Sequence, residues 1–127
     1  MRGLACLAAL ALAACAAAPA REAGRAQPRL VSLNPCTDAI LAEVADPEQL
    51  LAISSYSHDP ASSSMDLAQA RRFRATGGSV EEILSLKPDV VVGTGFMSPA
   101  TVQALDGLGL RLERFGIAAT VEDSKAQ

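Results

Sequence analysis

Short apolar runs alternate with polar turns and amphipathic stretches from position 29 onward. The run 89–93 is continuous and β-branched at its centre, which is typical of a strand buried on both faces of a parallel sheet. Strands are also predicted over 30–33, 50–54 and 110–115, and the last alternates apolar and charged residues as an edge strand does. Strands separated by helices indicate right-handed crossovers, so the sequence predicts an α/β fold: an open parallel sheet with flanking helices, a Rossmann-like single lobe.

Capping residues mark the starts of the predicted helices. Asn34 can cap a first helix with Pro35 in its first turn, and Ser79 with Glu82 forms a capping box for another. A short helix is expected near 65–71, and Ser98 begins the last long one. The apolar positions expected on the inward faces are Ile40, Leu41 and Val44 of the first helix and Val102, Leu105 and Leu108 of the last.

Three loops follow the carboxyl ends of predicted strands. They span 34–37, 56–60 and 94–98. Ligands of open α/β sheets bind beyond the carboxyl ends of the strands, so these loops should converge on one binding edge.

Residues 1–20 do not share this pattern and predict a secretory signal. Arg2 precedes an uninterrupted apolar run over 4–14, which is too short for a membrane span of about 20 residues. The stretch 12–15 resembles a bacterial lipobox, in which Cys15 would be lipidated after cleavage. Cleavage after Ala20 is the alternative and would release an unanchored protein. Residues 21–28 lack periodicity and predict a tether.

Composition narrows the classes of function. The 127 residues allow one ordinary domain, and a net charge of −3 with interspersed signs argues against nucleic acid as a partner. Two of the three cysteines lie in the predicted signal, so Cys36 alone cannot form an internal disulfide. With His58 as the single histidine, no metal site of the cysteine or histidine type is expected, and no cofactor.

Three segments together resemble a known family. They are 29–38 (RLVSLNPCTD), 54–60 (SSYSHDP) and 78–92, whose stretch EEILSLKPDVVV is the most specific. The chain from 29 to 127 resembles the amino-terminal lobe of the periplasmic binding proteins for cobalamin and ferric siderophores. The resemblance implies a carrier, not an enzyme, that captures a corrinoid or ferric chelate in the periplasm. It also implies delivery of that ligand to an ABC-type permease in the inner membrane.

The same resemblance directs attention to the strand-end loops for the ligand. In cobalamin-binding relatives a tyrosine at the position of Tyr56 packs on the ligand, while Ala75 stands where a second aromatic residue is expected. Each position also has a purely structural interpretation, such as helix capping by Asn34 or solvation of His58. The candidate ligand-binding residues are Asn34, Pro35, Cys36, Tyr56, Ser57, His58, Gly95 and Phe96.

Two adjacent glutamates receive different interpretations. Glu82 is accounted for by the capping box. The resemblance implies that a surface glutamate at the position of Glu81 pairs with arginines of the permease. Exposed charges of this kind set orientation and association rate more than affinity.

The end of the sequence predicts a helix start at 120–123 with few residues after it. The resemblance implies a second lobe beyond a long helix, so the chain is expected to be a single lobe, truncated or one half of a split carrier. Two other functions remain open: a haem-binding periplasmic protein with Tyr56 as axial ligand, and a small periplasmic enzyme. The enzyme is disfavoured because no acid, base and nucleophile set is apparent. A purely structural or partner-binding lobe is a third alternative.

Overall fold

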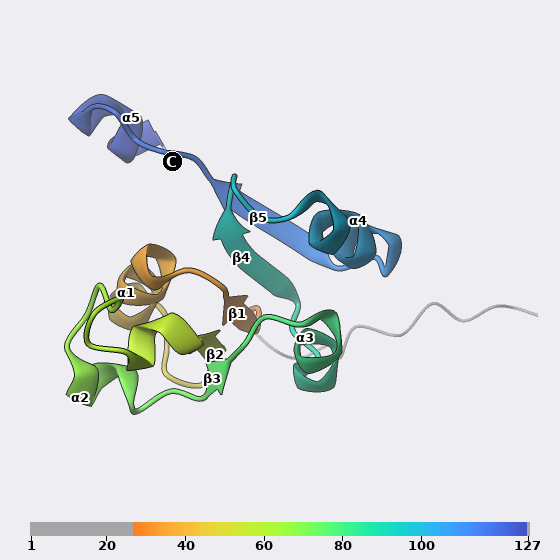
Figure 1. Cartoon of the computed structure of the whole chain (residues 1–127), viewed down its shortest axis with the longest axis horizontal. Helices are drawn as coiled ribbons and strands as arrows, with labels where there is room; N and C mark the ends of the chain where they lie inside the picture. Colours follow the sequence, from red (N-terminus) through yellow and green to blue (C-terminus); the bar gives the residue numbers. More distant parts are fainter. Residues whose placement is uncertain (1–26, 127) are drawn as a thin grey trace, which may run out of the picture.

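The computed structural model describes residues 27–126, which form a five-stranded parallel sheet with helices on both faces (Figure 1). The predicted export signal with Cys15, and most of the predicted tether, lie outside the described residues. The strands are β1 (Leu30–Ser32), β2 (Leu50–Ser54), β3 (Ala75–Thr76), β4 (Val90–Thr94) and β5 (Arg111–Phe115). The helices are α1 (Pro35–Val44), the 3-10 turn η1 (Ser55–His58), α2 (Leu67–Ala70), α3 (Val80–Leu86), α4 (Pro99–Gly107) and α5 (Val121–Ala126).

The strand order β3-β2-β1-β4-β5 places the first strand at the centre of the sheet. The chain runs outward from β1 through α1 to β2 and β3, then returns across α3 to β4 and continues through α4 to β5. All pairings are parallel, and Leu30 of β1 lies beside both Leu50 of β2 and Val90 of β4. This confirms the predicted open α/β lobe and the predicted edge position of the last strand.

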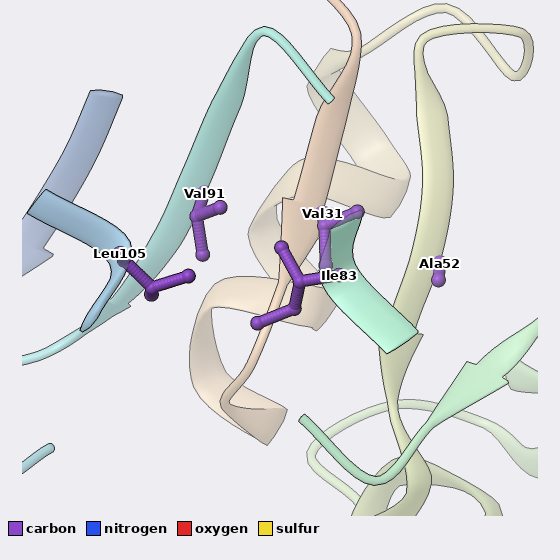
Figure 2. Close-up of a cluster of buried hydrophobic side chains, with 5 residues drawn as sticks. All are labelled: Val31, Ala52, Ile83, Val91 and Leu105. Atoms are coloured by element: carbon purple, nitrogen blue, oxygen red, sulfur yellow. The ribbon is translucent and has the colours of Figure 1, made fainter. Parts of the chain in front are cut away.

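The core consists of two apolar clusters. In one, Ile83 of α3 lies over Val31 of β1, and Leu105 of α4 lies beside Val91 of β4 (Figure 2). The other contains Leu50, Ile53 and Ala70, with Leu41 of α1 packed against it. Because the two clusters use different helices, α3 and α4 cover one face of the sheet while α1 and α2 cover the other.

The predicted inward faces of α1 and α4 are partly wrong. Ile40 and Val44 are 61% and 73% exposed. They lie four positions apart on the outer side of α1, whereas Asp38 and Leu41 face the sheet. Leu108 is 52% exposed because α4 ends at Gly107 and Leu108 belongs to the following turn. Leu105 is buried as predicted.

Three short elements complete the fold. The pattern did not predict η1 or the two-residue strand β3, which pairs with the end of β2. The predicted helix start at Thr120 is confirmed, since its hydroxyl accepts from the Asp123 amide and Asp123 accepts from the Thr120 amide, both at 3.0 Å. The resulting α5 is fully exposed and lies away from the sheet (Figure 1).

Candidate ligand-binding site

The strand order reverses between β1 and β4, and this defines where a ligand would bind. After β1 the chain turns into α1, on one face of the sheet, whereas after β4 it turns into α4, on the other face. Such a switch point leaves a crevice beyond the carboxyl ends of the two strands. The loop 34–37 therefore lies between the turn after β2 and the loop 94–98, and all three leave the same edge of the sheet, as the sequence predicted.

The loop after β1 is organised by its helix cap. The side-chain oxygen of Asn34 accepts from the Cys36 amide at 2.9 Å, and Pro35 occupies the first turn. Cys36 is exposed, with its sulfur 3.8 Å from the Ser64 hydroxyl. The loop thus presents an asparagine, a proline ring and a free thiol at the edge of the sheet.

The turn after β2 presents an aromatic ring to solvent. The Ser54 hydroxyl caps η1 by accepting from the Tyr56 amide at 3.2 Å, and the Tyr56 side chain is 64% exposed. No hydrogen bond to the Tyr56 hydroxyl is recorded within residues 27–126. His58 is half-buried, and its Nε2 lies 3.1 Å from the Ala70 carbonyl. The imidazole therefore ties η1 to α2 through one of its two nitrogens.

Asp38, to which the sequence analysis assigned no role, lies behind this turn. Its side chain is completely buried, and Oδ2 accepts from the Ser57 hydroxyl at 2.6 Å and from the Ser54 amide at 3.0 Å. Its Oδ1 is buried and has no partner among the described residues. Ser57 is likewise fully buried, so the structure places its hydroxyl inside the turn and away from the surface of the site.

Burial dominates the electrostatics of Asp38. Removal from water disfavours the charged carboxylate and raises its pKa, while hydrogen bonds from serine hydroxyls and the Ser54 amide partly oppose the rise. Helical periodicity could have identified Asp38 as buried, because Asp38 lies on the same face of α1 as Leu41. It did not do so because aspartate is usually exposed.

The loop after β4 holds a second exposed ring. The Gly95 amide donates to the Phe115 carbonyl at 2.9 Å, which attaches the loop to β5. Phe96 is 75% exposed, whereas the neighbouring Met97 packs against the core. Gly93 makes room for Met97, since a Cβ at that position would overlap its sulfur. The loop is therefore anchored by Met97 and presents Phe96 outward.

The two glutamates of α3 differ as predicted. Glu82 completes the capping box with Ser79 and also accepts from the Thr76 hydroxyl at 3.1 Å. These hydrogen bonds lower the pKa of Glu82, and the bond from the Thr76 hydroxyl has the largest effect. Glu81 is exposed in the first turn of the same helix, with no recorded hydrogen bond or ion pair within 27–126.

In the described part of the chain, no three histidine, cysteine, aspartate or glutamate side chains lie close enough together to hold a metal ion. None of the helices in residues 27–126 has the length and apolarity needed to cross a membrane.

The fold and this edge define a class of protein. The carboxyl edge of this open α/β lobe carries the two exposed rings of Tyr56 and Phe96, the Asn34 helix cap and the Cys36 thiol, which is the kind of edge where ligands of such sheets bind. The class is that of a ligand-binding lobe.

The sequence profile of a family described as "Periplasmic binding protein" matches residues 30–108. The chain belongs to this family. Membership in a family of binding proteins agrees with the expectation that the chain is not an enzyme, and it confirms the resemblance inferred from the three sequence segments.

Solved structures with a similar fold include a periplasmic heme binding protein from Pseudomonas aeruginosa, with a TM-score of 0.60 and 21% identity over 79% of this chain. The periplasmic heme binding protein HutB of Vibrio cholerae has a TM-score of 0.56 and 18% identity over 75%. The periplasmic vitamin B12 binding protein BtuF of Vibrio cholerae has a TM-score of 0.52 and 27% identity over 75%. The chain spans 36% of the length of each. A comparison with curated protein sequences gave no significant match.

Proposed function

We propose that this chain is the amino-terminal lobe of the substrate-binding component of an ABC-type importer. It captures cobalamin or an iron-siderophore complex in the periplasm and delivers it to a permease in the inner membrane. The observation that carries the proposal is the exposure of Tyr56 and Phe96 on two loops at the same edge of the sheet. Exposed rings beside a switch point suit a large ligand with apolar faces.

Each loop contributes in a different way. The rings of Tyr56 and Phe96 pack against the ligand, while Asn34, Pro35 and Cys36 form the rim between them. Gly95 lets the ligand approach the backbone closely, because it has no side chain. His58 lies behind Tyr56, where its hydrogen bond to α2 steadies the turn.

Haem is the second candidate ligand. The Tyr56 hydroxyl is exposed and has no recorded partner within the described residues, so it is available as an axial ligand to iron. Several proteins with a similar fold are periplasmic heme binding proteins, which supports testing this ligand beside cobalamin.

Absorption spectroscopy with haemin and with cyanocobalamin separates the two candidates. If Tyr56 ligates haem iron, Tyr56→Phe should abolish the haem band, because the substitution removes only the hydroxyl. If Tyr56 packs on a corrinoid, Tyr56→Phe should retain cyanocobalamin and Tyr56→Ala should lose it, since the ring provides the contact.

Phe115→Leu serves as a matched control, because Phe115 is a half-buried ring at the end of β5. Its spectra should equal those of the unmodified protein. Failure of both ligands to remain with the protein after dialysis would refute binding of cobalamin and of haem by this chain.

We assign Glu81 to docking on the permease. It is exposed, and the capping of α3 uses its neighbour Glu82 instead. Glu81→Lys should therefore reduce uptake of labelled cyanocobalamin by cells while the binding spectra stay unchanged. A loss of binding in Glu81→Lys would contradict a docking role.

A further inference from the structure

A buried carboxylate links two of the three site loops. Asp38 belongs to the first turn of α1, and its Oδ2 accepts from the Ser54 amide at the end of β2 and from the Ser57 hydroxyl within η1. The Ser57 contact is short at 2.6 Å, and both residues are completely inaccessible to solvent. Hydrogen bonds to charged acceptors inside a protein are among the strong ones.

Further polar contacts surround this link. The Thr37 hydroxyl lies 2.8 Å from the Ser32 hydroxyl and donates to the Asn34 carbonyl at 3.0 Å. The Asp38 amide donates to the same carbonyl at 2.8 Å. The carboxyl ends of β1 and β2 are thus joined through the start of α1, next to the turn η1 that carries Tyr56.

Fold stability alone gives no reason for a carboxylate here. A buried acid with one oxygen lacking a partner costs free energy that an apolar residue would not. An apolar side chain, however, could not accept from Ser54 and Ser57 together. The presence of a buried aspartate in spite of this free-energy cost is explained if the geometry of η1 is needed for ligand binding.

We propose that Asp38 is a positioning residue for the site, fixing the turn that carries Tyr56 to the first turn of α1. Without this link, η1 is held by its Ser54 cap and by the His58 contact with α2. Its effect on the ligand rests on the proposed function, whereas its effect on Tyr56 does not.

The chain contains one tyrosine and no tryptophan, so tyrosine fluorescence reports on Tyr56 alone. The experiment measures the anisotropy and the acrylamide quenching of this emission in the ligand-free protein. Ser57→Ala and Asp38→Ala should lower the anisotropy and increase the quenching, because the turn loses its anchor. Asp38→Asn should restore values near those of the unmodified protein, since its amide oxygen can still accept from both donors.

Ser55→Ala is the matched control. Ser55 is in the same turn and exposed, and no hydrogen bond of its hydroxyl is recorded within 27–126, so the variant should behave like the unmodified protein. Ser57→Ala decides the question even if Asp38→Ala fails to fold. Equal anisotropy and quenching in Ser57→Ala, Ser55→Ala and the unmodified protein would overturn the proposal.

A ligand titration adds the functional consequence. The titration uses haemin or cyanocobalamin, whichever the unmodified protein retains. The dissociation constant of Ser57→Ala for this ligand should be on the order of tenfold higher than that of Ser55→Ala. Equal affinity of the two variants would refute the ligand part of the proposal. Retention of neither ligand by the unmodified protein would refute cobalamin and haem as its ligands, while the tyrosine signal would still test the role of Asp38.

Discussion

Two residues of this lobe are held in energetically unfavourable environments: Lys87 by its backbone conformation and Asp38 by its burial. Lys87 ends α3 in the left-handed conformation at φ 52° and ψ 54°, which residues with a Cβ avoid. Asp38 is buried in a pocket that disfavours its charge. Both states leave measurable signatures.

Lys87→Gly should stabilise the fold. Glycine removes the conflict between the Cβ and the backbone at positive φ, so we expect a gain of about 0.5–1 kcal/mol in the free energy of unfolding. Urea unfolding measures it. Lys87→Ala is the control, because it removes the charge but keeps the Cβ; a gain no larger for glycine than for alanine would contradict the explanation.

Asp38→Asn should change the pH dependence of stability. The pKa of Asp38 is raised in the fold, so its stabilising contribution is complete below the ordinary value of 3.8 and lost as pH rises through the folded-state pKa. The stability of Asp38→Asn relative to the unmodified protein should therefore increase as the pH rises above about 4, and it should level off above the folded-state pKa of Asp38. Urea unfolding at several pH values tests this, with the exposed substitution Asp106→Asn as control. A difference independent of pH would exclude this titration.

Among the elements, the loop between β4 and α4 depends on one close contact. Gly93 lies in the buried strand, and the sulfur of Met97 occupies the space where a side chain would begin. Met97 lies between Phe96 and the Ser98 cap of α4, so this contact anchors the loop that carries the exposed ring.

Gly93→Ala should force Met97 outward and destabilise the protein by about 1–3 kcal/mol. In the double variant Gly93→Ala/Met97→Ala, the overlap between the new Cβ and the Met97 sulfur disappears. The double variant should therefore lose less free energy of unfolding than the two single variants lose in sum. Urea unfolding of all four proteins gives the coupling energy. Strict additivity would mean that the two positions do not compete for space.

The sequence pattern was informative for elements with a strong local signal. The β-branched run predicted β4, and the capping residues predicted the starts of α1, α3 and α4. It did not predict β3, because two residues carry no periodicity and this strand depends on its pairing with β2. The predicted inward face of α1 was wrong because a buried aspartate carries no apolar signal, and for the same reason the sequence did not point to Asp38 as part of the candidate site.

For the whole molecule, the open question at the amino terminus is attachment. Cys15 lies in a stretch that resembles a lipobox, and lipidation there would keep a carrier near its permease. One acyl chain binds membranes reversibly, whereas two or more hold firmly.

Labelled palmitate should be incorporated into the protein in cells and should disappear in Cys15→Ala. Cys36→Ala is the control, because that thiol is exposed but lies within the folded lobe. A mature amino terminus at Arg21 would instead show cleavage after Ala20 and a freely diffusing carrier.

The central pairing of β1 with β4 also sets the order of events during synthesis. The Arg29 amide donates to the Asp89 carboxylate across a sequence separation of 60 residues, next to the junction of the two strands. At about 5–20 residues per second, a ribosome needs several seconds to supply the partner of the first strand. The middle of the sheet therefore closes late, and until β4 has been synthesised β1 lacks one of its two neighbouring strands.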